Sequence, residues 1–287
     1  MSVSEIPEEW LEKLNTKMGA DGIPHIRRPF EAISTWTRDN NCSICLDSPT
    51  AEFVFQWFKV HSPDGSHAIG SLFTGVYFFD AYFWKVSVPI AYGTVQLNAL
   101  DQIVELPEFL RNRLMADRER LVDYLTLWTN ALDYGFGVDD LRGCRKLVGF
   151  AAELAAGADQ ELRATVRLLT ESRHANSKAM ESAGLATEMF LKAYLATHVG
   201  LTELEAKQLS HNLAKTADKC KRVKGLIEFE RIAQLINVFP AWGARYKGND
   251  YDNMRLWVAY SVAQFAAATF TRSLTDRDSR AQAFGSR

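Results

Sequence analysis

The sequence predicts an α+β protein, with antiparallel strands and helices in residues 1–157 and helices alone in residues 158–287. Two observations support this fold class. Aromatic and β-branched residues concentrate between residues 51 and 92 around a Pro-Asp-Gly turn, which is typical of antiparallel strands. Beyond residue 107, apolar residues recur at spacings of three and four, which is typical of amphipathic helices.

The first two elements are expected to be helices. Residues 7–18 begin with a proline, which suits the first position of a helix, and their apolar side chains fall on one face. Residues 20–28 contain Gly22 and Pro24 and form a loop. The spacing of Phe30, Ile33 and Trp36 indicates a second, short helix. Residues 38–50 are polar and rich in turn-forming residues.

Strands are expected next. The segments 51–60, 69–79 and 82–92 are short and rich in Phe, Val, Tyr and Trp. Between the first two, Pro63 to Gly65 forms a turn, because proline presets φ and glycine accepts a positive φ. These segments predict a meander of three or more antiparallel strands. Its aromatic cluster is interpreted as core, with a surface that stacks nucleic-acid bases as the alternative.

Helices follow from residue 107 to residue 132. A loop is expected at residues 133–142, where Gly135 and Gly137 occur among three aspartates that could also hold a metal ion. A helix over residues 147–155 is expected to end at Gly157. The boundary between the two domains is therefore placed at residues 157–159.

The remaining residues predict four or five helices that begin at recognisable caps. Asp159, Ser177 and Ser210 are candidate N-caps, and Thr202 with Glu205 has the spacing of a capping box. A strongly apolar helix is expected from about residue 254 to residue 274. Its core side chains are predicted to be Leu256, Tyr260, Ala263, Ala267 and Phe270.

Charge and hydropathy limit the classes of partner. The chain has 287 residues and a formal net charge of −2, which is not a nucleic-acid-binding composition overall. Residues 207–255, however, contain 10 Lys/Arg and 5 Asp/Glu, a local excess of 10 − 5 = +5. This segment is either a solvated helical surface or a surface for an anionic partner. No membrane span or secretion signal is recognised, and a cytoplasmic location is expected.

The cysteines predict reduced thiols and no metal or cofactor. Cys42-x-x-Cys45 has the spacing of half a zinc site, but no second Cys or His pair follows it. No phosphate-binding glycine loop, nucleophile elbow or His-Glu-x-x-His motif occurs.

Three motifs in residues 160–275 resemble, in this order, those of the HEPN family. They are Ala186-Thr-Glu188-Met-Phe-Leu191-Lys192-Ala193, His211-Asn212-Leu213 and Arg245-Tyr246. The resemblance covers about 115 residues. It implies a helical bundle that forms dimers, and it marks Glu188, Lys192, His211, Arg245 and Tyr246 as candidate binding residues.

Many HEPN proteins are metal-independent RNases, with an Arg-x₄₋₆-His motif near the last helices. The imidazole transfers protons and the guanidinium stabilises phosphate charge. In this chain no histidine follows His211, and Asp250 stands where the histidine after Arg245 would fall. Arg167 and His174 have an acceptable spacing but lie earlier in the domain. They are the only candidate catalytic pair, and a surface Arg and His is the alternative interpretation.

The sequence therefore favours a HEPN-like binding or interaction protein that is not an enzyme. Family analogy suggests a dimer or larger assembly in a prokaryotic stress, toxin–antitoxin or defence system. Two alternatives remain. One is an RNase that uses Arg167 and His174, or an enzyme with a site in the N-terminal domain. The other is an RNA or nucleotide binder that uses residues 207–255. Glu188 is expected to accept a hydrogen bond from a buried neighbour, with Arg245 as the preferred partner.

Overall fold

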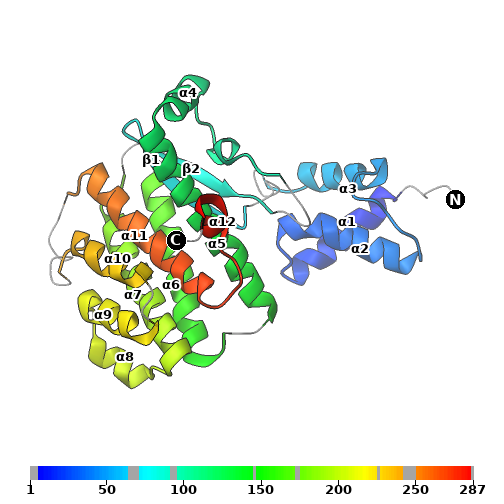
Figure 1. The fold of residues 1–287 in the computed structure, drawn as a ribbon. Coiled ribbons are helices and arrows are strands. Elements are labelled where there is room, and N and C mark those ends of the chain that lie inside the picture. The colour runs from blue at the N-terminus through cyan, green and yellow to red at the C-terminus, as the bar shows by residue number, and fades with distance from the viewer. Residues whose placement is uncertain are drawn as a thin grey trace. The chain divides into compact units, whose positions relative to one another are not determined.

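A computed structural model of the chain divides it into two units, residues 1–70 and residues 71–287, and each is described by itself (Figure 1). The boundary expected at residues 157–159 falls inside a continuous helix, α6 (Gly149–Thr170). The structure describes residues 6–63, 71–90, 96–144, 147–171, 175–224, 227–241 and 250–285.

The first unit consists of helices around a small core. The helices α1 (Glu8–Ala20) and α2 (Arg28–Asp39) agree with the two helices expected here, and the short 3₁₀ helix η1 (His25–Arg27) precedes α2. The third helix is α3 (Pro49–Val60). The core of this first unit consists of Ile6, Leu11, Met18, Ala32, Ile33, Trp36, Ala51, Val54, Trp57 and Phe58.

Helix α3 corrects the prediction of a strand at residues 51–60. Ser48 caps the helix, because its Oγ accepts a hydrogen bond from the Ala51 N–H at 3.3 Å, and Pro49 occupies the first turn. Val54, Trp57 and Phe58 are buried at the i, i+3, i+4 spacing of one helical face. Aromatic content was therefore misread as a strand signal, although the cap and the spacing both indicate a helix.

The second unit contains a two-stranded antiparallel hairpin, β1 (Phe73–Phe79) and β2 (Tyr82–Val88). Asp80 and Ala81 connect the strands with φ of 53° and 62°, as a tight hairpin turn requires. These strands lie within the expected segments 69–79 and 82–92. The prediction of three or more strands is wrong for the described residues, which form a sheet of two. Within the turn expected at Pro63 to Gly65, residues 64 and 65 lie outside the described residues.

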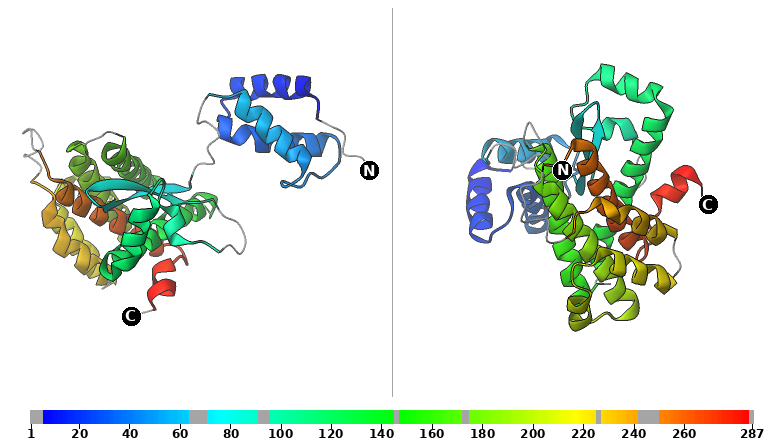
Figure 2. Two further views of the ribbon diagram at one scale, coloured as in Figure 1. Left: turned by 90° about the horizontal axis from the view of Figure 1, so that it is seen from above. Right: turned by 90° about the vertical axis from the view of Figure 1, so that its left-hand side faces the viewer.

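Helices make up most of the second unit, and the hairpin packs against three of them, α5, α6 and α11 (Figure 2). One 3₁₀ helix, η2 (Ala99–Gln102), precedes them, and another, η3 (Ile236–Val238), lies among them. The α-helices are α4 (Glu108–Ala116), α5 (Arg118–Cys144), α6, α7 (Lys178–Val199), α8 (Glu203–Leu209), α9 (Leu213–Lys224), α10 (Ile227–Leu235), α11 (Asn253–Arg272) and α12 (Ser279–Phe284).

Helix α5 runs through the loop expected at residues 133–142. Its glycines allow close packing, because a Cβ at Gly137 would lie 2.9 Å from the Thr271 Cβ of α11. A Cβ at Gly135 would lie 3.0 Å from Val88 Cγ1 in β2. Glycine here therefore marks close approach of elements rather than a break in the helix.

Helices α6, α7 and α11 pack against one another and form the centre of the core. The five core side chains predicted in α11 are all buried. Residues 178–197 and 256–272 are helical throughout, as predicted. In the part of the chain that the structure describes, no helix is both long enough and apolar enough to cross a bilayer.

The expected helix caps agree with the structure only in part. Thr202 and Glu205 form the reciprocal capping box at the start of α8. Ser177 makes no capping bond, and the Asn176 side chain instead accepts from the Lys178 N–H. Asp159 lies inside α6 and caps nothing there.

Candidate functional site

The polar centre of the second unit is an ion pair within α7. Glu188 and Lys192 are four residues apart on one helical face, and Lys192 Nζ lies 2.6 Å from Glu188 Oε1. Their side chains are only 7% and 9% exposed. Glu188 therefore does accept a hydrogen bond from a buried neighbour, as predicted, and that neighbour is on its own helix.

This pair also holds the loop between α8 and α9. Lys192 Nζ donates to the Ser210 carbonyl oxygen at 2.8 Å, and Glu188 Oε2 lies 3.0 Å from His211 Nδ1. The two oxygens of one carboxylate thus engage an ammonium and an imidazole. The partner expected for Glu188, Arg245, lies outside the described residues.

Ser210 has an unusual backbone conformation. Its φ of 51° and ψ of −143° are unfavourable for a residue with a β-carbon and cost about 1–3 kcal/mol. Two hydrogen bonds hold it: the Ser210 N–H donates to the Lys207 carbonyl at 2.9 Å, and its own carbonyl accepts from Lys192. The buried ion pair therefore contributes to a strained loop conformation.

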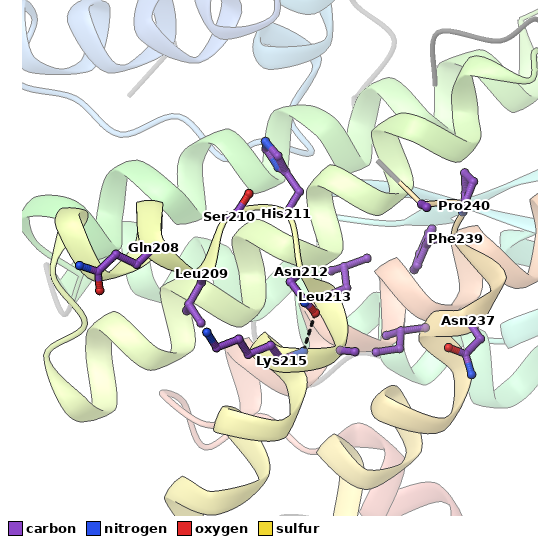
Figure 3. Close-up of a pocket in the computed structure, with 13 residues that line it drawn as sticks. Gln208, Leu209, Ser210, His211, Asn212, Leu213, Lys215, Asn237, Phe239 and Pro240 are labelled. Atoms are coloured by element: carbon purple, nitrogen blue, oxygen red, sulfur yellow. Dashed lines mark hydrogen bonds between the residues drawn. The ribbon is translucent and has the colours of Figure 1, made fainter. Parts of the chain in front are cut away.

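Asn212 begins the next helix. Its Oδ1 accepts a hydrogen bond from the Lys215 N–H at 2.9 Å (Figure 3). Asn212 is therefore the residue that caps α9, and the expectation that Ser210 would do so is wrong. Because Asn, Asp and Ser are similar as N-caps, their order along the chain could not decide between them.

An open hollow of about 620 Å³ lies beside this loop (Figure 3). Its size falls within the range of about 300–1,000 Å³ that is usual for small-molecule sites. In Figure 3 the His211 ring and the Lys215 side chain lie on opposite sides of the loop. The lining residues are Gln208, Leu209, Ser210, His211, Asn212, Leu213, Ala214, Lys215, Ile236, Asn237, Phe239, Pro240 and Ala241.

Only one member of the candidate catalytic pair lies within the described residues. Arg167 is exposed in the last turn of α6, and His174 lies outside the described residues. Arg245 and Tyr246 also lie outside them. Asp250 is described, and the Ser177 Oγ lies 3.5 Å from its Oδ1.

The thiols and acidic residues do not form a metal site where the structure describes them. Cys42 and Cys45 are exposed free thiols, whereas Cys220 is buried. Burial raises the pKa of the Cys220 thiol, which donates to the Leu191 carbonyl oxygen. Among the described residues, no group of three or more His, Cys, Asp and Glu side chains is placed to hold a metal ion.

A second buried polar network was missed in the sequence. Asp133 is fully buried on α5 and accepts hydrogen bonds from Arg272 Nε at 2.8 Å and from the Ser279 N–H at 2.6 Å. Arg272 also donates to Asn130. The network joins α5, α11 and α12. No local signal predicts it, because the two residues on α5 lie more than 130 residues before Arg272 and Ser279 in the sequence.

Comparison with protein-family models, with curated proteins and with solved structures gave no match to this chain.

Proposed function

We propose that the C-terminal helices form a HEPN-like module that binds a ligand or partner and does not cleave RNA. The proposal rests on the HEPN-like motifs and on one structural observation. Two of the three motifs supply Glu188, Lys192 and His211. The Glu188 carboxylate contacts both of the other side chains. The motif residues therefore have a common physical task, which is to hold the loop between α8 and α9.

The same observation argues against catalysis by this cluster. Cleavage of RNA needs a cation that can reach the phosphate charge and an imidazole that can transfer a proton. The Lys192 ammonium is turned inward and contacts Glu188 and the Ser210 carbonyl. The contact at His211 Nδ1 orients the ring and does not exclude proton transfer at Nε2, so the inward-turned ammonium is what argues against cleavage. What the cluster supplies is a rigid loop beside the hollow, and this suits binding.

The proposed partner is a second copy of the chain, because HEPN proteins commonly form dimers. Sedimentation equilibrium of the full chain measures this directly. A mass of twice 32.4 kDa is the expected result. A monomer at all concentrations tested would contradict the proposed dimer and leave the ligand-binding proposal standing.

Binding of RNA or a nucleotide is the second candidate function. It is favoured by two exposed lysines on α9: Lys215, which lines the hollow, and Lys219, one turn further along the helix. The test is binding of single-stranded RNA at increasing salt, because each phosphate contact steepens the salt dependence. Lys215→Ala with Lys219→Ala should lower the affinity. Lys13→Ala on α1, which is also exposed, is the control.

The experiment that tests the absence of catalysis is RNA cleavage by the purified chain with EDTA present. The variants are His174→Ala, Arg167→Ala and Arg245→Ala. Equal background cleavage by the wild type and all three variants is expected. Metal-independent cleavage that His174→Ala abolishes would overturn the proposal, since a general acid–base group contributes about 10²- to 10⁴-fold.

A further inference from the structure

Two arginines from different helices lie over one aromatic ring. Arg231 of α10 and Arg280 of α12 have their Cζ atoms 5.4 Å and 5.5 Å from the centroid of Phe265 on α11. Phe265 is itself buried. A guanidinium that contacts a ring with its face keeps the N–H groups along its edge available. The ring therefore positions two sets of donors.

A third arginine lies close by. Arg272 at the end of α11 has a side chain that is 10% exposed, and its Nη1 is buried without a hydrogen-bond partner in the structure. Burial, and repulsion from Arg272 and Arg231, lower the pKa of Arg280. Helices α10, α11 and α12 thus each bring one arginine to the same place, although the three positive charges repel one another.

The chain compensates this charge only in part. Arg272 forms an ion pair with the buried Asp133, and Asp278 lies 3.9 Å from Arg272 Nε. Glu228 and Asp278 also act favourably on the charge of Arg280. Among the described residues, however, neither Arg231 nor Arg280 forms a hydrogen bond or ion pair. The positive charge that remains available belongs to these two side chains.

We propose that Arg231 and Arg280 bind a phosphate group, carried either by a free nucleotide or by single-stranded RNA. Arginine suits this ligand because its planar donors match phosphate oxygens in pairs. Helix α12 supplies Arg280, and its first turn is anchored where Asp133 accepts the Ser279 N–H. The site is separate from the hollow beside α9 and does not depend on the function proposed there.

Calorimetric titration of the full chain tests the proposal with three probes: adenosine 5′-monophosphate, inorganic phosphate and a short single-stranded RNA. Adenosine, which lacks the phosphate, is the control ligand and should not bind. Arg231→Ala and Arg280→Ala should each weaken binding by about tenfold or more. Arg280→Lys should recover part of the loss, because it keeps the charge and loses the paired donors.

The control variant is Arg27→Ala, because Arg27 is exposed, forms an i, i+4 pair with Glu31 and lies outside the basic segment 207–255. It should leave binding of the phosphate probes unchanged.

Binding of RNA without binding of the nucleotide would support the site and identify RNA as the source of the phosphate. The proposal is overturned if no phosphate-bearing probe binds, or if Arg27→Ala weakens binding as much as Arg280→Ala. Thermal unfolding of each variant verifies that α12 remains folded onto α5.

Discussion

At the scale of single residues, buried charges carry most of the information about this protein. Glu188 and Lys192 are among the buried residues of α7, where an unpaired charge is costly. The sequence was sufficient to infer that Glu188 needs a partner. It was not sufficient to identify His211 as the second one, because that contact depends on how the loop after α8 returns to α7.

The first prediction concerns this pair. Glu188→Gln removes the charge that compensates Lys192 and leaves a buried ammonium with only neutral acceptors, the glutamine amide oxygen and the Ser210 carbonyl. We expect a loss of about 3 kcal/mol in the free energy of unfolding, measured by urea denaturation. Adding Lys192→Met should restore part of it, because both charges are then absent.

Glu203→Gln is the matched control for this prediction. Glu203 forms an i, i+4 pair with Lys207 on α8, but both side chains are well exposed. Exposed pairs contribute little, so the free energy of unfolding should change far less than for Glu188→Gln. Equal losses for Glu188→Gln and Glu203→Gln would contradict the assignment of a structural role to the buried pair.

At the scale of elements, two helices show why local patterns were misread. The segment Ala51 to Val60 was interpreted as a strand from its aromatic content, and residues 133–142 as a loop from their glycines and aspartates. Both are helical. In the first case a cap and a buried face outweigh β propensity. In the second, the rest of a long helix and its packing outweigh the cost of glycine in a helix.

Gly137 provides the second prediction. Gly137→Ala would place a Cβ 2.9 Å from Thr271 Cβ, so α5 and α11 must move apart. We expect a net destabilisation of about 1–3 kcal/mol by urea denaturation, despite the better helix propensity of alanine. Gly184→Ala on α7 is the control, because its nearest contact is 3.4 Å. The close approach is refuted if Gly137→Ala stabilises the chain as Gly184→Ala should.

Ser48 provides the third prediction, at the start of α3. Ser48→Ala removes the acceptor for the Ala51 N–H. A loss of about 1 kcal/mol is expected for residues 1–70, measured by chemical denaturation of the full chain. Ser34→Ala, at an exposed position inside α2, should change stability by less than about 0.5 kcal/mol. If residues 51–60 formed a strand, Ser48 would cap no helix, and the two variants should lose similar amounts of stability.

At the scale of the whole molecule, the described residues form two separate hydrophobic cores, one in each unit. The boundary between residues 70 and 71 differs from the one expected at residues 157–159. A helix break was expected after Gly157, but α6 continues through it and packs along α7. The hairpin and α5 therefore belong to the same unit as residues 158–287.

This division gives the fourth prediction. Residues 71–287 expressed alone should unfold in one cooperative transition, because their core, as far as the structure describes it, contains no side chain from residues 6–63. The midpoint of thermal unfolding should lie close to that of the matching transition in the full chain. The complementary truncation, residues 158–287, should fail to fold, since it removes α5, the hairpin and the first half of α6. A cooperative transition for residues 158–287 would instead support the boundary expected from the sequence.

The sequence by itself determined the helical segments with clear periodicity, the capping box at Thr202 and the buried face of α11. These depend on residues a few positions apart, and local spacing reveals them. Only the tertiary structure decided that Glu188, Lys192 and His211 form one network, that Asp133 pairs with Arg272, and that Arg231 and Arg280 share the ring of Phe265. Those contacts join residues that are distant along the chain, and their formation depends on how whole helices pack.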